Sequence, residues 1–231
     1  MPTATAGLSL LPSPAPQDVV TETIAPRPAP PPSGATPSSA VVSASPATGE
    51  ATALVYEGFG SQLLAVELPV PGAPALASIT YSSQEDWRHF SLWAFDDEYR
   101  QLGLLVNTLG SFSGTAALDL AEGDPVTSYL GVDAAGAWTI RIDPVSSARR
   151  VSGEVRGSGP DTFLYTGDTS VTLVANQSSG RFALRSVDGR SPELLVDQIG
   201  MFESEIVLPG DRLVVVQAQG AWVLSPQPPS P

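Results

Sequence analysis

The chain has no cysteine, no lysine and a single histidine, His89. Without cysteine it can form neither a disulfide nor a thiolate metal site. A zinc site built from histidines needs several of them, and a Ser-His-Asp triad would depend on His89 alone. No apolar run approaches the roughly 20 residues that a helix needs to cross a bilayer. We therefore expect no metal, no cofactor and no membrane span in this chain.

Positive charge is scarce as well. The 11 basic residues are all arginine, and against 24 acidic residues they give a net charge of −13. Because an acidic protein repels phosphate backbones, we do not expect nucleic-acid partners. The first residues also show neither the basic start nor the apolar core of a secretory signal peptide.

Proline is abundant, and it is concentrated at the N-terminal end. Residues 1–50 hold 11 of the 23 prolines, set mostly among alanine, serine and threonine. This composition favours polyproline II and open coil, and it offers few large apolar side chains to offset the ordering entropy. We predict a disordered spacer at residues 1–52 and a similar tail at 226–231. Such spacers are common in surface stalks, so we expect a secreted or cell-surface protein, with an inert linker of any compartment as the alternative.

The most informative feature of the folded part is an internal repeat. Three blocks align without gaps and in the same order: 89–96 with 181–188, 104–112 with 194–202, and 136–138 with 220–222. Repeats at a fixed separation indicate duplicated structural units. We place one unit at residues 53–143 and the other at 151–225, with a linker at 144–150.

The hydrophobic period within these units is two. Phe90 and Leu92 alternate with polar or variable residues, and Phe182 and Leu184 hold the same places in the second copy. Alternation of this kind, interrupted at short intervals by turn signals such as Asp188-Gly189, is typical of strands in a sandwich or barrel. We predict an all-β fold of two tandem, duplicated β-sandwich modules with a jelly-roll-like form.

The best candidate for function lies on the other face of the first of these strands. Alternation places Trp87, His89, Ser91 and Trp93 on one outward side. Flat indoles there could stack on sugar rings or on an aromatic partner, and aromatic residues are enriched at binding hot spots. We predict Trp87, His89 and Trp93 as ligand-binding residues. The alternative is that both tryptophans are buried by the neighbouring module or by a covering loop.

Catalytic and metal sites find little support in the sequence. Ser91 is the hydroxyl nearest to His89, but no Gly-x-Ser-x-Gly motif is present and the second copy has Arg181 in place of the histidine. The acidic cluster at residues 96–98 could hold calcium, although a solvated turn explains it better. Trp138 and Trp222 recur in both copies on the apolar face, and we expect them in the core.

A family resemblance adds to this interpretation. The segments 136–142 (Gly-Ala-Trp-Thr-Ile-Arg-Ile) and 64–73 resemble the closing and opening strands of bacterial pre-peptidase C-terminal β-sandwich domains. The resemblance implies a non-catalytic appendage of a secreted protein, and some members bind calcium or polymeric substrates. The chain departs from that pattern at residues 89–92 and 181–184, where an Asp-Leu-Tyr strand is usual. The block at 104–112 lies outside the pattern and is consistent with a separate family of exported bacterial proteins.

Together these features predict a non-enzymatic binding module, displayed on a Pro-rich spacer, with a glycan or a protein as its partner. One alternative is a purely structural accessory β-domain of a larger exported protein. The other is a hydrolase that uses carboxylates.

Overall fold

The computed structural model describes residues 43–44 and 53–227. The predicted disordered spacer and tail lie almost wholly outside these residues. Within them the chain forms β-strands, turns and one short 3-10 helix, η1 (Val145–Ser147), so the predicted all-β fold is confirmed. No helix in the described part has the length and apolar character that a membrane crossing requires.

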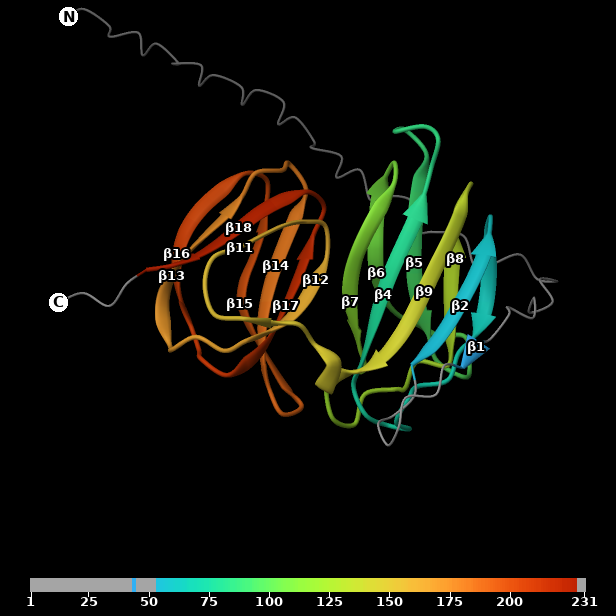
Figure 1. The fold of residues 1–231 in the computed structure, drawn as a ribbon, viewed down its shortest axis with the longest axis horizontal. Helices are drawn as coiled ribbons and strands as arrows, with labels where there is room; N and C mark the ends of the chain where they lie inside the picture. The colour runs from blue at the N-terminus through green and yellow to red at the C-terminus, as the bar shows by residue number, and fades with distance from the viewer. Residues whose placement is uncertain (1–42, 45–52, 228–231) are drawn as a thin grey trace, which may run out of the picture. The chain divides into compact units, whose positions relative to one another are not determined.

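The first sandwich is built from eight main strands that pair antiparallel (Figure 1). One sheet has the order β2-β9-β4-β7, with the short strand β1 added beside β2, and the other has the order β3-β8-β5-β6. The strands are β1 (Ser43–Ala44), β2 (Leu54–Phe59), β3 (Gln62–Ala65), β4 (Ala75–Ser82), β5 (His89–Phe95), β6 (Gln101–Leu109), β7 (Phe112–Leu118), β8 (Tyr129–Asp133) and β9 (Ala137–Pro144).

The second sandwich repeats this plan. One sheet has the order β11-β18-β13-β16, and the other has the order β12-β17-β14-β15, with β10 pairing parallel to β12. The strands are β10 (Arg150–Val151), β11 (Val155–Ser158), β12 (Asp161–Tyr165), β13 (Ser170–Asn176), β14 (Arg181–Asp188), β15 (Ser191–Ile199), β16 (Phe202–Leu208), β17 (Arg212–Ala218) and β18 (Ala221–Pro226).

The two copies therefore share one topology. When the eight main strands of each copy are counted along the chain, the first, eighth, third and sixth form one sheet, and the second, seventh, fourth and fifth form the other. This is the strand order of a jelly roll, in which the chain passes repeatedly from one sheet to its partner. Each copy encloses its own apolar cluster, and the two clusters have no residue in common. The module boundaries at 53–143 and 151–225 stay a prediction.

The repeated apolar residues lie where the two-residue period predicts. Phe90, Leu92, Phe182 and Leu184 are all fully buried. Phe90 stacks near Phe112, with 6.2 Å between ring centroids, and the equivalent pair Phe182 and Phe202 meets edge to face at 5.4 Å. Such aromatic pairs add about 1 kcal/mol beyond the burial of their area.

A tryptophan closes the first sandwich against two glycines. The Trp138 indole Nε1 donates a hydrogen bond to the carbonyl oxygen of Gly60, at 2.9 Å. Its ring occupies the space that a Cβ at Gly58 would take. Gly60 has φ +72°, in the left-handed region that glycine adopts without steric cost. The Gly-x-Gly segment thus holds the buried indole from two sides.

The second sandwich contains the same arrangement. Trp222 Nε1 donates to the carbonyl oxygen of Gly159 at 2.8 Å, and a Cβ at Gly157 would overlap the indole. Both tryptophans are buried, as the repeat predicts. We call this repeated unit the glycine–tryptophan lock, and it gives both Gly-x-Gly segments a structural role.

Candidate functional site

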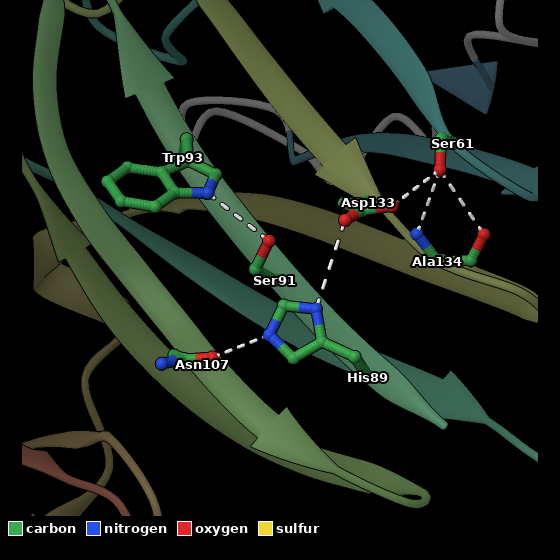
Figure 2. A network of polar contacts seen from close by, with 7 residues as sticks. All are labelled: Ser61, His89, Ser91, Trp93, Asn107, Asp133 and Ala134. Carbon is green, nitrogen blue, oxygen red and sulfur yellow. Dashed lines mark hydrogen bonds and ion pairs between the residues drawn. The ribbon is translucent and has the colours of Figure 1, made fainter. Parts of the chain in front are cut away.

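The candidate site lies on the outer face of the β3-β8-β5-β6 sheet in the first sandwich (Figure 2). Along β5, Phe90 and Leu92 point into the core, whereas His89, Ser91 and Trp93 point away from it. We call this solvent-side surface of the sheet the outer face. The sequence prediction that these three side chains lie side by side matches the strand geometry.

Trp87 differs from the other three. It lies in the turn before β5 rather than in the strand, so the prediction that it continues the same strand face is wrong. Its side chain is 63% exposed, and the Arg88 guanidinium lies 4.3 Å from its ring centroid. Arg88 also forms an ion pair with Glu85, at 2.6 Å. The indole of Trp87 is thus available at the surface, beside a paired cation.

His89 bridges the neighbouring strands of the sheet. Its Nε2 lies 2.7 Å from Asn107 Oδ1 on β6, and its Nδ1 lies 3.8 Å from Asp133 Oδ2 on β8 (Figure 2). Because an amide oxygen can only accept, the short contact requires the proton on Nε2. The Asn107 amide then keeps its two N–H donors for other partners. The imidazole is therefore hydrogen-bonded to β6 and lies beside the carboxylate on β8.

Asp133 is itself oriented by the turn that joins β2 and β3. The Ser61 hydroxyl donates to Asp133 Oδ1 at 2.8 Å and accepts the backbone N–H of Ala134 at 3.2 Å. Ser61, Asp133, His89 and Asn107 form a line of hydrogen-bonding groups across the outer face (Figure 2). We call these four residues the polar row.

Trp93 lies next to the polar row and is hydrogen-bonded to Ser91 on the same strand. The indole Nε1 donates to Ser91 Oγ at 3.2 Å, so the ring is turned back along β5 (Figure 2). Ser91 is buried, whereas Trp93 stays partly exposed. A single hydrogen bond of this kind contributes about 1 kcal/mol, and it favours this orientation of the indole. The aromatic ring is therefore preorganised beside a set of fixed polar groups.

The groups of the outer face differ from those of a serine–histidine pair. In the described part of the chain, neither ring nitrogen of His89 is hydrogen-bonded to a serine hydroxyl, and Ser91 instead accepts from Trp93. A nucleophile that needs a base must lie within hydrogen-bond reach of it. What the outer face does offer is a flat ring beside an amide, a carboxylate and a hydroxyl, which suits stacking and hydrogen bonding.

The equivalent face of the second copy carries different groups at the same positions. Arg181 replaces His89 and binds Asp197, which replaces Asn107, through contacts of 2.8 and 2.6 Å. The hydrogen bond from the Arg181 guanidinium holds the pKa of the Asp197 carboxyl below its usual value. Arg185 replaces Trp93 and donates to Gln217 at 2.6 Å. At these positions the second copy therefore has one ion pair and one arginine–glutamine hydrogen bond, and it lacks the aromatic ring.

The acidic cluster at residues 96–98 has a structural role. Asp96 is buried and accepts hydrogen bonds from the backbone N–H groups of Glu98 and Arg100 and from the Arg100 guanidinium, at 3.0, 2.8 and 2.7 Å. Both oxygens of the Asp96 carboxylate thus accept hydrogen bonds from within the turn. Across residues 53–227, no group of three or more histidine or acidic side chains is arranged to hold a metal ion.

Sequence reasoning missed Ser61, Asn107 and Asp133. They come from separate strands and turns, and only the pairing of strands brings them to His89. One signal was present in the repeat, because His89 and Asn107 change together into Arg181 and Asp197 between the copies. Two positions that change as a pair between copies indicate a contact, whereas Ser61 and Asp133 lie outside the three aligned blocks.

Comparisons with known proteins add little to this geometry. No family model matches the chain, and no curated protein matches it in sequence. Among solved structures, a cupin 2 conserved barrel domain protein from Leptotrichia buccalis is similar over 83% of this chain and 91% of that one, at 8% identity and a TM-score of 0.25. A regulatory subunit of a cAMP-independent protein kinase A from Trypanosoma cruzi, bound to guanosine, is similar over 71% of each chain, at 10% identity and a TM-score of 0.21. Neither likeness is close enough to carry an argument about function.

Proposed function

We propose that the protein is a non-catalytic binding module and that the outer face of the first sandwich binds a glycan. The observation that carries the proposal is the Trp93 indole, held by Ser91 beside the polar row. The second copy has the same scaffold without this combination. We further propose that the module acts at the cell surface or outside the cell, carried on its Pro-rich spacer.

The chemistry of the polar row favours a sugar over other ligands. Each sugar hydroxyl both donates and accepts, and the row offers donors in the Asn107 amide and acceptors in the Asp133 carboxylate. The C–H face of a sugar ring can pack on the adjoining Trp93 indole, which is apolar and flat. Since the protein carries a net charge of −13, a neutral glycan suits it better than an acidic one.

The proposal is tested by removing the exposed indole of Trp87 together with the partly exposed indole of Trp93. We expect the double variant Trp87→Ala, Trp93→Ala to bind neutral oligosaccharides at least about 30-fold more weakly than the wild type, because truncating a hot-spot aromatic costs about 2 kcal/mol or more. Isothermal titration with oligomers of β-1,4-linked glucose and of N-acetylglucosamine measures the effect.

The matched control is Arg185→Ala, since Arg185 occupies the position of Trp93 in the second copy. This control variant should bind as the wild type does. Equal affinity of the wild type and the double tryptophan variant would reject the site. Absence of binding by the wild type would instead favour the role of a structural accessory domain.

A further inference from the structure

The outer face continues beyond Trp93 as a band of aromatic side chains. Phe95 follows Trp93 by two residues on β5 and therefore shares its face. Tyr129 on β8 lies directly opposite Phe95 in the strand register. Tyr99, from the turn after β5, stacks on Tyr129 with 4.6 Å between ring centroids and an interplanar angle of 25°. We call Trp93, Phe95, Tyr129 and Tyr99 the aromatic band.

A glycine makes the band continuous between β5 and β8. Gly131 lies opposite Trp93, and a Cβ at this position would come within 2.8 Å of the Phe95 ring. The phenyl ring therefore lies over the Gly131 backbone, close to the position of the Trp93 side chain. In the second copy the position of Gly131 is taken by Val215, and no aromatic residue needs that space.

Tyr99 has an unusual backbone conformation. It has φ +61°, a left-handed conformation that is uncommon outside glycine, and it is 54% exposed. The turn that holds it there is fixed by the buried Asp96 carboxylate, which accepts from the backbone on both sides of Tyr99. Strained residues held by their surroundings cluster at functional sites. In this turn the strained backbone of Tyr99 leaves its ring exposed to solvent.

The second copy shows that the fold does not require this tyrosine. Its corresponding turn has Gly189 in the left-handed conformation, with φ +60°. The positions of Phe95 and Tyr129 are taken there by Val187 and Leu213. An equivalent jelly roll thus forms without any member of the aromatic band, so a purely structural need does not explain the band.

We infer that Phe95, Tyr99 and Tyr129 form a second subsite and that the ligand is a neutral oligosaccharide chain of several sugar units. The inference rests on the proposed function and extends it. From His89 to Phe95 the strand advances about 20 Å, at about 3.3 Å per residue, which one sugar ring cannot bridge. The chain would run from the polar row along β5 to the paired tyrosines.

The negative charge near Tyr99 and Tyr129 favours a neutral sugar over an acidic one. Asp97 and Glu98 are exposed in the same turn, and Arg100 is already engaged by Asp96 and Glu98, at 2.7 and 3.1 Å. An incoming carboxylate or sulfate would meet uncompensated negative charge at this end. A neutral chain meets no such barrier, and it can use the stacked rings for its apolar faces.

The test separates the subsite from the proposed function through the dependence on ligand length. The probes are β-1,4-glucose and N-acetylglucosamine oligomers of one to six units, with an oligomer of galacturonic acid as the acidic comparison. For the wild type we expect affinity to rise at least tenfold between the shortest oligomer that binds and the hexamer, with no binding of the acidic oligomer. The variant Tyr99→Gly, which removes the ring and accepts the positive φ without steric cost, should lose that rise and bind short oligomers as the wild type does.

Two further measurements keep the result interpretable. Tyr99→Phe retains the ring and should retain the dependence on length, and the melting temperature of each variant should stay within a few degrees of the wild type. If Tyr99→Gly keeps the full dependence on length, the subsite is rejected while the glycan function stands. If no neutral oligomer binds the wild type, both are rejected. Binding of a proline-rich peptide that needs Tyr99, without binding of the sugars, would assign the face to a protein partner instead.

Discussion

At the scale of single residues, Asp96 is the ionisable group whose surroundings matter most. Burial on its own would raise the pKa of the Asp96 carboxyl. The Arg100 guanidinium and the backbone N–H groups of Arg100 and Glu98 favour the charged form and outweigh burial, so the pKa lies below its usual value. The turn that carries Tyr99 is therefore held by a carboxylate that must stay ionised.

This turn should weaken at low pH. Since the folded-state pKa is lowered, ionised Asp96 stabilises the protein above the pKa of the unfolded chain, near 4, and that stability is lost as the pH falls through the folded value. We expect Asp96→Asn to lower the melting temperature at pH 7 and to have a smaller effect below pH 3. Thermal unfolding of both proteins from pH 7 to pH 2 measures the difference. A difference that is constant over this range would contradict the role assigned to the charge.

At the scale of elements, the glycine–tryptophan lock defines how each sandwich closes. The indole of Trp138 fills the place of a side chain on β2, and its N–H satisfies a carbonyl at the end of that strand. Both contacts need glycine: Gly58 lacks the Cβ that would collide, and Gly60 takes a positive φ at the turn. Strand pairing and core packing thus depend on the same three residues.

Adding one methyl group should therefore disrupt the lock. We expect Gly58→Ala and Gly157→Ala to destabilise the protein by about 1–3 kcal/mol, the usual cost of overpacking a core. The matched controls are Gly103→Ala and Gly153→Ala, where a new Cβ meets no atom within 4 Å and φ is not positive. Urea unfolding followed by tryptophan fluorescence compares the four variants. Similar stability of all four would show that the indole can move aside.

The sequence allowed much of the fold to be predicted and less of the site. Alternation is a local signal, so it identified the buried Phe90 and Leu92 and the outward Trp93 directly. The polar row instead depends on strand register, which joins residues as distant as Ser61 and Asp133, 72 positions apart. The prediction that Trp87 lies on the strand was wrong for a related reason, because alternation does not reveal where a strand begins.

At the scale of the whole molecule, two apolar clusters without shared residues make up the interior. Each contains its own lock and its own aromatic pair. Perturbations confined to one cluster should act on the strands that line it, since coupling between residues is strong where they share partners.

Native-state hydrogen exchange tests this separation. We expect Gly58→Ala to reduce the protection of backbone amides in β2 and β9 and to leave β11 and β18 unchanged, with Gly157→Ala giving the reverse pattern. The two controls at Gly103 and Gly153 should leave both sets of strands protected. Loss of protection in both sandwiches from either substitution would show that the two cores unfold as one unit.

The pair formed by His89 and Asn107 has a consequence for how such a surface can change over time. Its counterpart in the second copy is the pair Arg181 and Asp197. The same cross-strand position thus holds a histidine–asparagine pair in one copy and an arginine–aspartate pair in the other. Passing from one pair to the other takes two substitutions, and each single substitution, His89→Arg or Asn107→Asp, changes the charge of the site while it keeps a donor opposite an acceptor. In a duplicated module one copy can change at this position while the other keeps its original pair. Duplication thus gives the surface a route to new chemistry that a single sandwich lacks.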